Sequence, residues 1–289
     1  MPTKNIDLQC HTTASDGNLA PAELVELALK NKLNAIAITD HDSVNGIDEA
    51  IKTAKGKIEI IPGVEISCDD IGFVDTHILG LFINHESKTL NNLLKDAKKY
   101  RMQQKKDIIK KFKEFGFRIS YEEVRKIAKG EIGRPHIAKI ILKNNPNKVS
   151  SVDEVFEKYL SVGKKAYVER RNGISVKRAI KAIHAAKGFA FIAHPGVYNN
   201  FGIEKFIKYF LKCGGDGMET YYNYESSRNH TSFKQINKIN KKFRDIAKKY
   251  KMLETGGSDF HGRANQVLGK LKVSYSVLDR MKKARDKFK

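Results

Sequence analysis

The chain has 289 residues, with 54 Lys and Arg against 33 Asp and Glu and no Trp. Its length allows one large domain or one domain with an insertion. Because no run of eighteen apolar residues occurs and the N-terminus lacks a secretory pattern, we expect a cytoplasmic protein without a membrane span. Three cysteines without paired CxxC spacing fit a reducing compartment better than a disulfide framework.

The net charge of +21 is distributed unevenly. Residues 1–85 carry 6 basic against 13 acidic side chains, whereas residues 86–165 carry 21 against 10. An acidic first region beside basic segments suits an enzyme that holds cations and attracts a polyanion. The alternative is that all proteins of the source organism are rich in Lys. The positive charge would then be unrelated to the function of this chain.

The first 85 residues alternate short strands and helices. Strands are expected over 6–10, 34–39 and 58–67, and an amphipathic helix over 21–33 has Pro21 at its N-terminal end. This rhythm is typical of βα units and predicts an α/β fold with a parallel sheet.

The pattern changes near residue 86. A long basic helix is expected over 88–115, and shorter helices follow around 121–129, 134–143 and 151–160. The alternation of helix and strand then resumes, with a further helix near 226–250. We therefore expect 1–85 and 166–289 to form one α/β domain, and 86–165 to form a helical insertion.

Six short segments place His, Asp or Glu at the ends of these apolar runs. They are DLQCHTTASDG (7–17), TDHD (39–42), GVE (63–65), THILG (76–80), AHPG (193–196) and GSDFH (257–261). Strand ends are where α/β folds build their active sites, and imidazoles with carboxylates are ligands of transition metals. Since five of the nine histidines fall in these segments, we predict a site with several metal ions.

Taken together and in this order, the segments resemble the motif set of the polymerase-and-histidinol-phosphatase (PHP) superfamily. The nearest branch is the TrpH-like one of nucleoside 3',5'-bisphosphate phosphatases and 5'-to-3' exoribonucleases. The resemblance implies a distorted seven-stranded (β/α) TIM-like barrel with a helical insertion. It also implies two or three divalent ions, usually manganese, iron or zinc.

The resemblance further implies which residues bind the metals. The first ion would be held by His11, Glu65 and Asp259 with the residue at position 9, the second by Asp16, His41 and His261, and the third by Glu65, His77 and His194. His41, Glu65, His194 and Asp259 form the expected catalytic set. Asp40 and Asp42 flank His41 and are expected to support the ligands.

Position 9 departs from the family pattern, because Gln9 stands where the family has a His. Alternate residues on a strand face the same side, so Gln9 and His11 should point together, but an amide oxygen is a poor ligand for a transition metal. Three explanations stay open: a natural loss that weakens the first metal site, a deliberate substitution that traps substrate, or a water that fills the vacant position.

The insertion carries residues that match phosphate-binding positions of the TrpH-like branch. They are Arg134 and His136 in GRPH, and Lys165 and Tyr167 in GKKAYV. The insertion would then form a lid over the metals, and Arg170 and Arg171 could extend the same surface. The alternative is that Arg134 caps or pairs with a helix while Lys165 is solvated.

The expected activity is hydrolysis of nucleoside 3',5'-bisphosphates, or of short RNA from its 5' end, by a metal-bound hydroxide. One alternative is a phosphatase for histidinol phosphate or another small phosphomonoester. A second is a weakened nucleotide- or RNA-binding protein, for which Gln9 is the argument. The partners expected are a nucleotide or short RNA, with no membrane and no obligatory protein partner.

Overall fold

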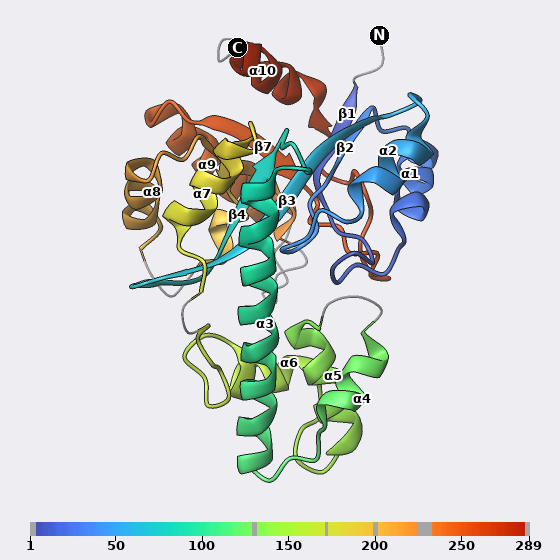
Figure 1. The fold of residues 1–289 in the computed structure, drawn as a ribbon, viewed down its shortest axis with the longest axis vertical. Helices are drawn as coiled ribbons and strands as arrows, with labels where there is room; N and C mark the ends of the chain where they lie inside the picture. Colours follow the sequence, from blue (N-terminus) through green and yellow to red (C-terminus); the bar gives the residue numbers. More distant parts are fainter. Residues whose placement is uncertain (1–3, 129–131, 171–172, 199–201, 225–232, 287–289) are drawn as a thin grey trace.

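The computed structural model describes residues 4–128, 132–170, 173–198, 202–224 and 233–286 (Figure 1). Within these residues eight strands form one sheet in the order β7-β6-β5-β4-β3-β2-β1-β8. The strands are β1 (Asn5–Cys10), β2 (Ala35–Ile38), β3 (Glu59–Asp70), β4 (Phe73–Leu81), β5 (Phe189–Ile192), β6 (Gly217–Tyr222), β7 (Leu253–Gly257) and β8 (Val273–Ser274).

The sheet curls into a nearly closed barrel, because β1 lies between β2 and the end of β7. Just beyond β7, the Phe260 N–H donates to the Gln9 carbonyl at 3.2 Å, and the His11 N–H donates to the Phe260 carbonyl at 2.8 Å. The predicted α/β barrel is therefore confirmed. Two details differ from the expectation: β4 runs antiparallel to both neighbours, and the two-residue β8 adds an eighth strand beside β1.

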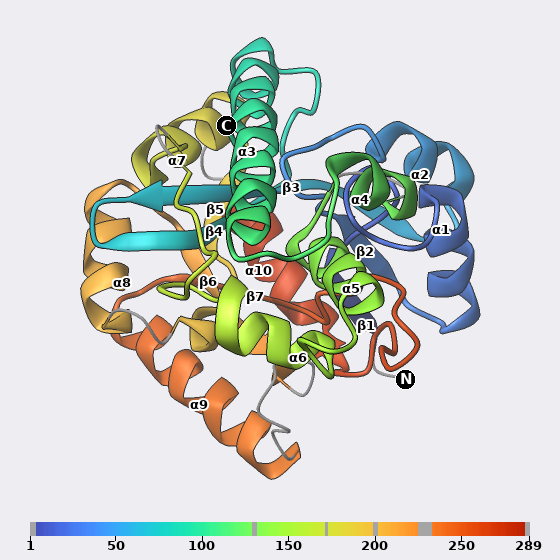
Figure 2. The same cartoon turned by 90° about the horizontal axis from the view of Figure 1, so that it is seen from below.

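Six helices of the described residues surround the barrel. They are α1 (Pro21–Lys30), α2 (Ile47–Ala54), α7 (Val176–Ala185), α8 (Ile203–Lys212), α9 (Phe233–Lys249) and α10 (Tyr275–Asp286). One hydrophobic cluster fills the space between the sheet and the outer helices. A second cluster joins the strands to α10, which covers the end of the barrel away from the helices of residues 121–155 (Figures 1 and 2). The part of the expected helix 226–250 before residue 233 lies outside the described residues.

A long helix, α3 (Lys88–Glu114), leaves the barrel and leads to α4 (Tyr121–Ile127), α5 (Arg134–Asn144) and α6 (Val152–Val155), which continues as a π-helical turn over Phe156–Leu160 (Figure 1). These helices enclose a third hydrophobic cluster, with Phe112 and Ile137 fully buried. In contrast, Leu90 and Leu94 at the start of α3 belong to the barrel cluster. No helix in the described ranges is both long enough and apolar enough to cross a membrane.

Candidate metal centre

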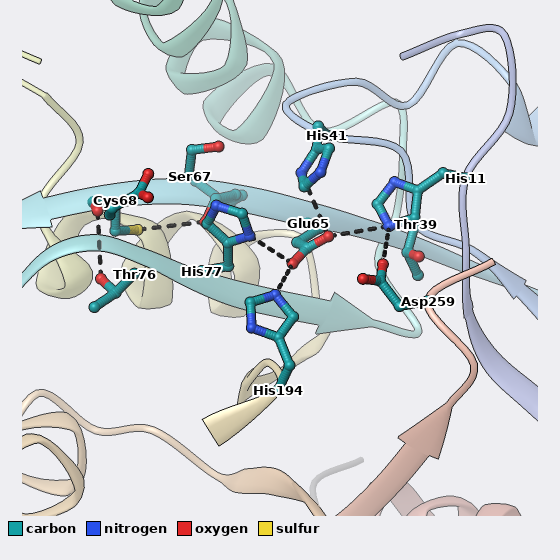
Figure 3. A network of polar contacts seen from close by, with 12 residues as sticks. His11, Thr39, His41, Glu65, Ser67, Cys68, Thr76, His77, His194 and Asp259 are labelled. Carbon is teal, nitrogen blue, oxygen red and sulfur yellow. Dashed lines mark hydrogen bonds and ion pairs between the residues drawn. The ribbon is translucent and has the colours of Figure 1, made fainter. Parts of the chain in front are cut away.

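Glu65 of β3 lies at the centre of a cluster of imidazoles (Figure 3). Its Oε1 is 2.8 Å from Nδ1 of His77 and 2.9 Å from Nε2 of His194. Its Oε2 is 3.1 Å from Nε2 of His11 and 3.3 Å from Nδ1 of His41. Burial opposes ionisation of this fully buried carboxyl, but the charges of His41 and His77 outweigh burial and hold the pKa of Glu65 well below its usual range.

Two further carboxylates extend the cluster on the side of His11. Asp259 Oδ1 is 3.0 Å from His11 Nε2, and Tyr222 donates its hydroxyl to Asp259 Oδ2 at 2.9 Å. Asp16 Oδ1 is 3.4 Å from Nε2 of His261, whose ring stacks on that of His11 with 4.1 Å between the centroids. Five imidazoles and three carboxylates therefore converge on one region.

The barrel brings these residues together because most of them sit where strands end. His11, His41, His194 and Asp259 come directly or shortly after β1, β2, β5 and β7. Asp259 and His194 have positive φ angles of 51° and 32°, a conformation that costs free energy outside glycine. The fully buried Glu219 of β6 accepts a hydrogen bond from the His194 N–H at 2.6 Å and so fixes this turn.

The chemistry of the cluster fits divalent cations. Several of its buried atoms have no hydrogen-bond partner in the described structure: Asp16 Oδ1, His41 Nδ1, Glu65 Oε2, His194 Nδ1 and Asp259 Oδ1. An unsatisfied buried polar atom costs about 1–3 kcal/mol. Nitrogen and oxygen atoms that face one another at this spacing are satisfied together by an ion between them.

The ligand atoms fall into three groups in which all atoms lie within 4.8 Å of one another. The groups are His11, Glu65 and Asp259; His11, Asp16, His41 and His261; and His41, Glu65 and His77. The first holds the residues expected for the first ion except Gln9, and the second contains the set expected for the second ion. The third differs from the expected set, because it holds His41 in place of His194, although His194 touches Glu65.

Gln9 is fully buried in β1, and neither its amide oxygen nor its amide nitrogen has a hydrogen-bond partner among the described residues. Gly257 packs directly against it, since a Cβ on Gly257 would lie 2.7 Å from the Gln9 Cβ. A buried amide with two unsatisfied atoms is costly, so packing does not account for this residue. The role of position 9 in binding the first ion stays a prediction.

Asp40 and Asp42 hold the loops that carry the cluster and belong to none of the three groups. Asp40 accepts hydrogen bonds from the Thr12 N–H at 2.7 Å and the Ser15 hydroxyl at 2.6 Å, which fixes the loop between His11 and Asp16. Asp42 accepts from the Ser67 N–H at 2.9 Å, and this bond ties the turn after β2 to β3.

A model of the PHP domain family matches residues 7–172, which is more than half of the chain. The chain belongs to the PHP family. A 5'-3' exoribonuclease of Haemophilus influenzae is 41% identical over 220 residues, covering 75% of this chain and 79% of the relative. A 3',5'-nucleoside bisphosphate phosphatase of Chromobacterium violaceum is 31% identical over 262 residues, covering 89% and 87%.

Solved structures share the fold along nearly the full length of this PHP chain. An amidohydrolase from Chromobacterium violaceum, solved with sulfate and without metal, has a TM-score of 0.81 and 29% identity, covering 97% of this chain and 96% of the other. A protein assigned as a metal-dependent phosphoesterase from Bifidobacterium adolescentis has a TM-score of 0.80 and 26% identity, covering 98% and 97%.

One of the predicted phosphate-binding residues of this PHP chain, His136, lies next to the centre. His136 and Asp16 line one cavity of about 260 Å³, together with Lys139 and Lys143 of α5. The Gly133 N–H donates to Nδ1 of His136 at 3.0 Å, so the neutral ring carries its proton on Nε2. Burial lowers the pKa of His136 and favours that neutral form.

Arg134 pairs with Asp75 of β4 at 2.7 Å, and the structure therefore gives it a carboxylate partner on the barrel. Tyr167 is buried, and its hydroxyl has no partner in the described structure.

Lys165 is exposed and lines a separate cavity with Glu157 and Tyr159, away from the cavity of Asp16. Arg171 lies outside the described residues. The roles of these residues in phosphate binding stay predictions.

Sequence reasoning missed two buried cations of α3. Arg101 donates to Asp42 at 3.0 Å, and Lys105 lies one turn further along the same face. Both are more than nine-tenths buried, at 8% and 4% exposure. The one available signal was that positions 101, 104, 105 and 108 share the spacing of a buried helical stripe, so that the two cations fall at core positions.

Proposed function

We propose that this PHP chain is a metal-dependent hydrolase of phosphate esters, and that its substrates are nucleoside 3',5'-bisphosphates and short RNA attacked from the 5' end. The observation that carries the proposal is Glu65, a buried carboxylate surrounded by four imidazoles. The names of the relatives support both substrate classes, and the acidic centre beside basic helices supports a polyanion as substrate.

Two or three divalent ions, of manganese, iron or zinc, are proposed to occupy the centre. Glu65, Asp16 and Asp259 would hold these ions together with the imidazoles around them. When bound, such ions activate a water molecule and neutralise charge on phosphate oxygens. The burial of the ligands keeps other water away, which strengthens every electrostatic contact in the site.

His136 is proposed to bind the substrate. Its Nε2–H is available as a donor, because its Nδ1 accepts from Gly133. Asp16 and Lys139 line the same cavity, so a phosphate held there would touch both the edge of the metal centre and basic side chains. A neutral imidazole at this place donates one hydrogen bond without drawing the substrate into a fixed ion pair.

We further propose that residues 86–165 form an insertion that covers the centre, while 1–85 and 166–289 form the barrel. The hydrophobic cluster that α4, α5 and the end of α3 share supports this division. The free thiols of Cys10, Cys68 and Cys213 support a place in the reducing cytoplasm.

The test is release of phosphate from adenosine 3',5'-bisphosphate in the presence of Mn²⁺. We expect turnover in the unchanged chain and loss of turnover in His41→Ala, because His41 contacts Glu65. His85→Ala is the matched control, since His85 pairs with Asp48 outside the centre and its loss should leave the rate unchanged.

Absence of turnover both in the chain as it stands and in Gln9→His would contradict the proposal. Faster hydrolysis of histidinol phosphate or sugar phosphates than of the nucleotide would favour a small-molecule phosphatase. Tight nucleotide binding without turnover, persisting in Gln9→His, would favour a binding protein.

A further inference from the structure

Behind the metal centre, four buried or partly buried basic residues gather around the inner face of α3. We call them the α3 cation cluster, which consists of Arg101, Lys105, Arg134 and Arg170. Three of them have a carboxylate partner: Arg101 pairs with Asp42, Arg134 with Asp75, and Arg170 with Asp69. The charges of these three pairs balance. The cluster as a whole therefore has one positive charge without a carboxylate partner, that of the fourth residue.

Lys105 is that fourth cation. It is 4% exposed, and its Nζ contacts the Gln104 Oε1 at 2.9 Å without an ion pair to a carboxylate of the described chain. Burial lowers the pKa of Lys105 well below its ordinary value, and the charges of Arg101 and Arg134 lower it further. A buried ammonium in such surroundings is costly unless an anion approaches it.

Two more donors of the same region have no partner within the described residues. They are Nε of Arg101 and the hydroxyl of Tyr167, and both side chains are buried. The segment of Tyr167 is held against α3, because Gln104 donates to the Val168 carbonyl at 2.6 Å and Lys111 donates to the Tyr167 carbonyl at 3.1 Å. The unpartnered atoms of the metal centre include carboxylate oxygens, which accept hydrogen bonds, whereas the two unpartnered atoms of this region are donors.

A cavity of about 270 Å³ opens between α3 and α4, and two of the cations, Arg101 and Lys105, line it. Its lining includes Lys98, Lys99, Arg101, Lys105 and Arg125 but no acidic residue and none of the nine candidate metal ligands. A cavity with this lining selects an anion and lies apart from the place of hydrolysis.

We infer that Lys105, Arg101 and Tyr167 bind a second phosphate of the substrate, the one that is not hydrolysed. This inference rests on the proposed function and deepens it, because it makes the enzyme select substrates that carry two phosphate groups. The second phosphate supplies the missing acceptors: an oxygen for the ammonium of Lys105, one for Nε of Arg101 and one for the Tyr167 hydroxyl.

The experiment compares adenosine 3',5'-bisphosphate with 3'-AMP and 5'-AMP as substrates. The quantity measured is the ratio of kcat/KM for the bisphosphate to kcat/KM for the better monophosphate. We expect Lys105→Met to lower this ratio by about tenfold or more, which is the usual effect of losing a charged hydrogen bond. Lys105→Arg should restore part of the ratio. Lys110→Met, an exposed lysine of the same helix, is the matched control.

An equal loss of kcat/KM on all three substrates would overturn the inference, since it would make Lys105 a general structural residue. Tyr167→Phe provides a second test that removes one hydroxyl only and keeps the ring. It should lower the ratio about threefold to tenfold. An unchanged ratio in both variants would also overturn the inference.

Calorimetry on the metal-free chain separates this inference from the proposed function. The chain stripped of metal is titrated with 5'-AMP, 3'-AMP and adenosine. We expect a monophosphate to bind at least tenfold more tightly than adenosine, and Lys105→Met to remove that advantage. If no substrate is turned over but this difference is present, the proposed hydrolysis fails and the phosphate site stands. If adenosine binds as tightly as the monophosphates, the phosphate site fails.

Discussion

The metal centre and the α3 cation cluster are both buried and polar, but they differ in how the chain builds them. The residues of the centre lie on several strands or just after them. His, Asp and Glu are uncommon beside such buried apolar runs. The cluster draws Arg101 and Lys105 from a single helix in a chain with 54 basic residues. A functional residue can therefore be predicted from the sequence when its type is unusual for its surroundings. It is overlooked when its type is common there.

The two regions also complement each other chemically. The centre presents carboxylate oxygens and imidazole nitrogens, which are ligand atoms for metal cations. The α3 cation cluster and the neighbouring Tyr167 present an ammonium, a guanidinium and a hydroxyl, which attract anions. Asp42 links them, because it follows His41 in the chain and pairs with Arg101. The following predictions test whether the two regions divide the work in this way.

The largest effect is expected for Glu65→Gln. The amide keeps the volume but removes the charge on which four imidazoles converge, so bound metal should fall by at least one ion per chain. Phosphate release should fall roughly a thousandfold, the scale of losing a central electrostatic contact. Elemental analysis and the phosphate assay measure the two quantities. Glu204→Gln on the exposed side of α8 is the control, and full metal content in Glu65→Gln would contradict the assignment.

The next effect is expected for Gln9→His. An imidazole here would add a ligand beside His11, so bound metal per chain should rise and the hydrolysis rate should increase by about tenfold to a hundredfold. Cys10→Ala, which alters the neighbouring side chain in the hydrophobic core, should change neither quantity. Unchanged metal content in Gln9→His would count against position 9 as a ligand.

A smaller effect concerns the basic rim of the α3 cavity. Affinity for a short oligoribonucleotide should fall steeply with added salt, with a log–log slope of about 0.7 per phosphate neutralised. Replacing Lys98 and Lys99 by Gln should make this slope shallower, whereas the same change at Lys248 and Lys249 of α9 should not. If the affinity of the unchanged chain did not depend on salt, the basic residues would not attract RNA electrostatically.

The smallest effect concerns a histidine of the barrel outside the centre. A hydrogen bond that the His184 ring donates to Asp216 raises the pKa of His184 above its ordinary 6.5, so the protonated ring stabilises the fold. This contribution is complete below that value and is lost as the pH rises through the raised pKa. His184→Gln should therefore cost a few tenths of a kcal/mol at pH 5.5 and nothing at high pH, because the pair is partly exposed. Urea unfolding at both pH values measures the difference, and a cost that grows with pH would contradict it.

Periodicity was enough to predict most of the barrel. The strands around Ile36, Val64 and Phe191 are short apolar runs with clear boundaries, and the structure contains them. The antiparallel β4, the two-residue β8 and α10 were not predicted. The hydrogen bonds of β4 depend on its position beside β5, and β8 is too short to show a pattern.

The metal ligands of the candidate site were predicted better than the basic residues around it. The residues from His11 to His261 could be placed together because the order of their motifs matches a known family, and the geometry then grouped eight of the nine. Lys165 was predicted to bind phosphate because it belongs to the GKKAYV segment, yet it lines a separate cavity. Arg101 and Lys105 were overlooked because charge on a helix normally indicates solvent exposure, and only packing shows that these two point inward.

The length of α3 has a consequence for the size of substrate that the enzyme accepts. Its first turns are anchored in the barrel core through Leu90 and Leu94, and its last turns are anchored in the core of the other helices through Ile108 and Phe112. A continuous helix that is packed at both ends does not bend easily, so it keeps a constant distance between its two ends. With the role inferred for Lys105, this rigidity would keep the phosphate site at a constant distance from the metal centre, and we expect weaker binding of substrates whose two phosphates are spaced differently.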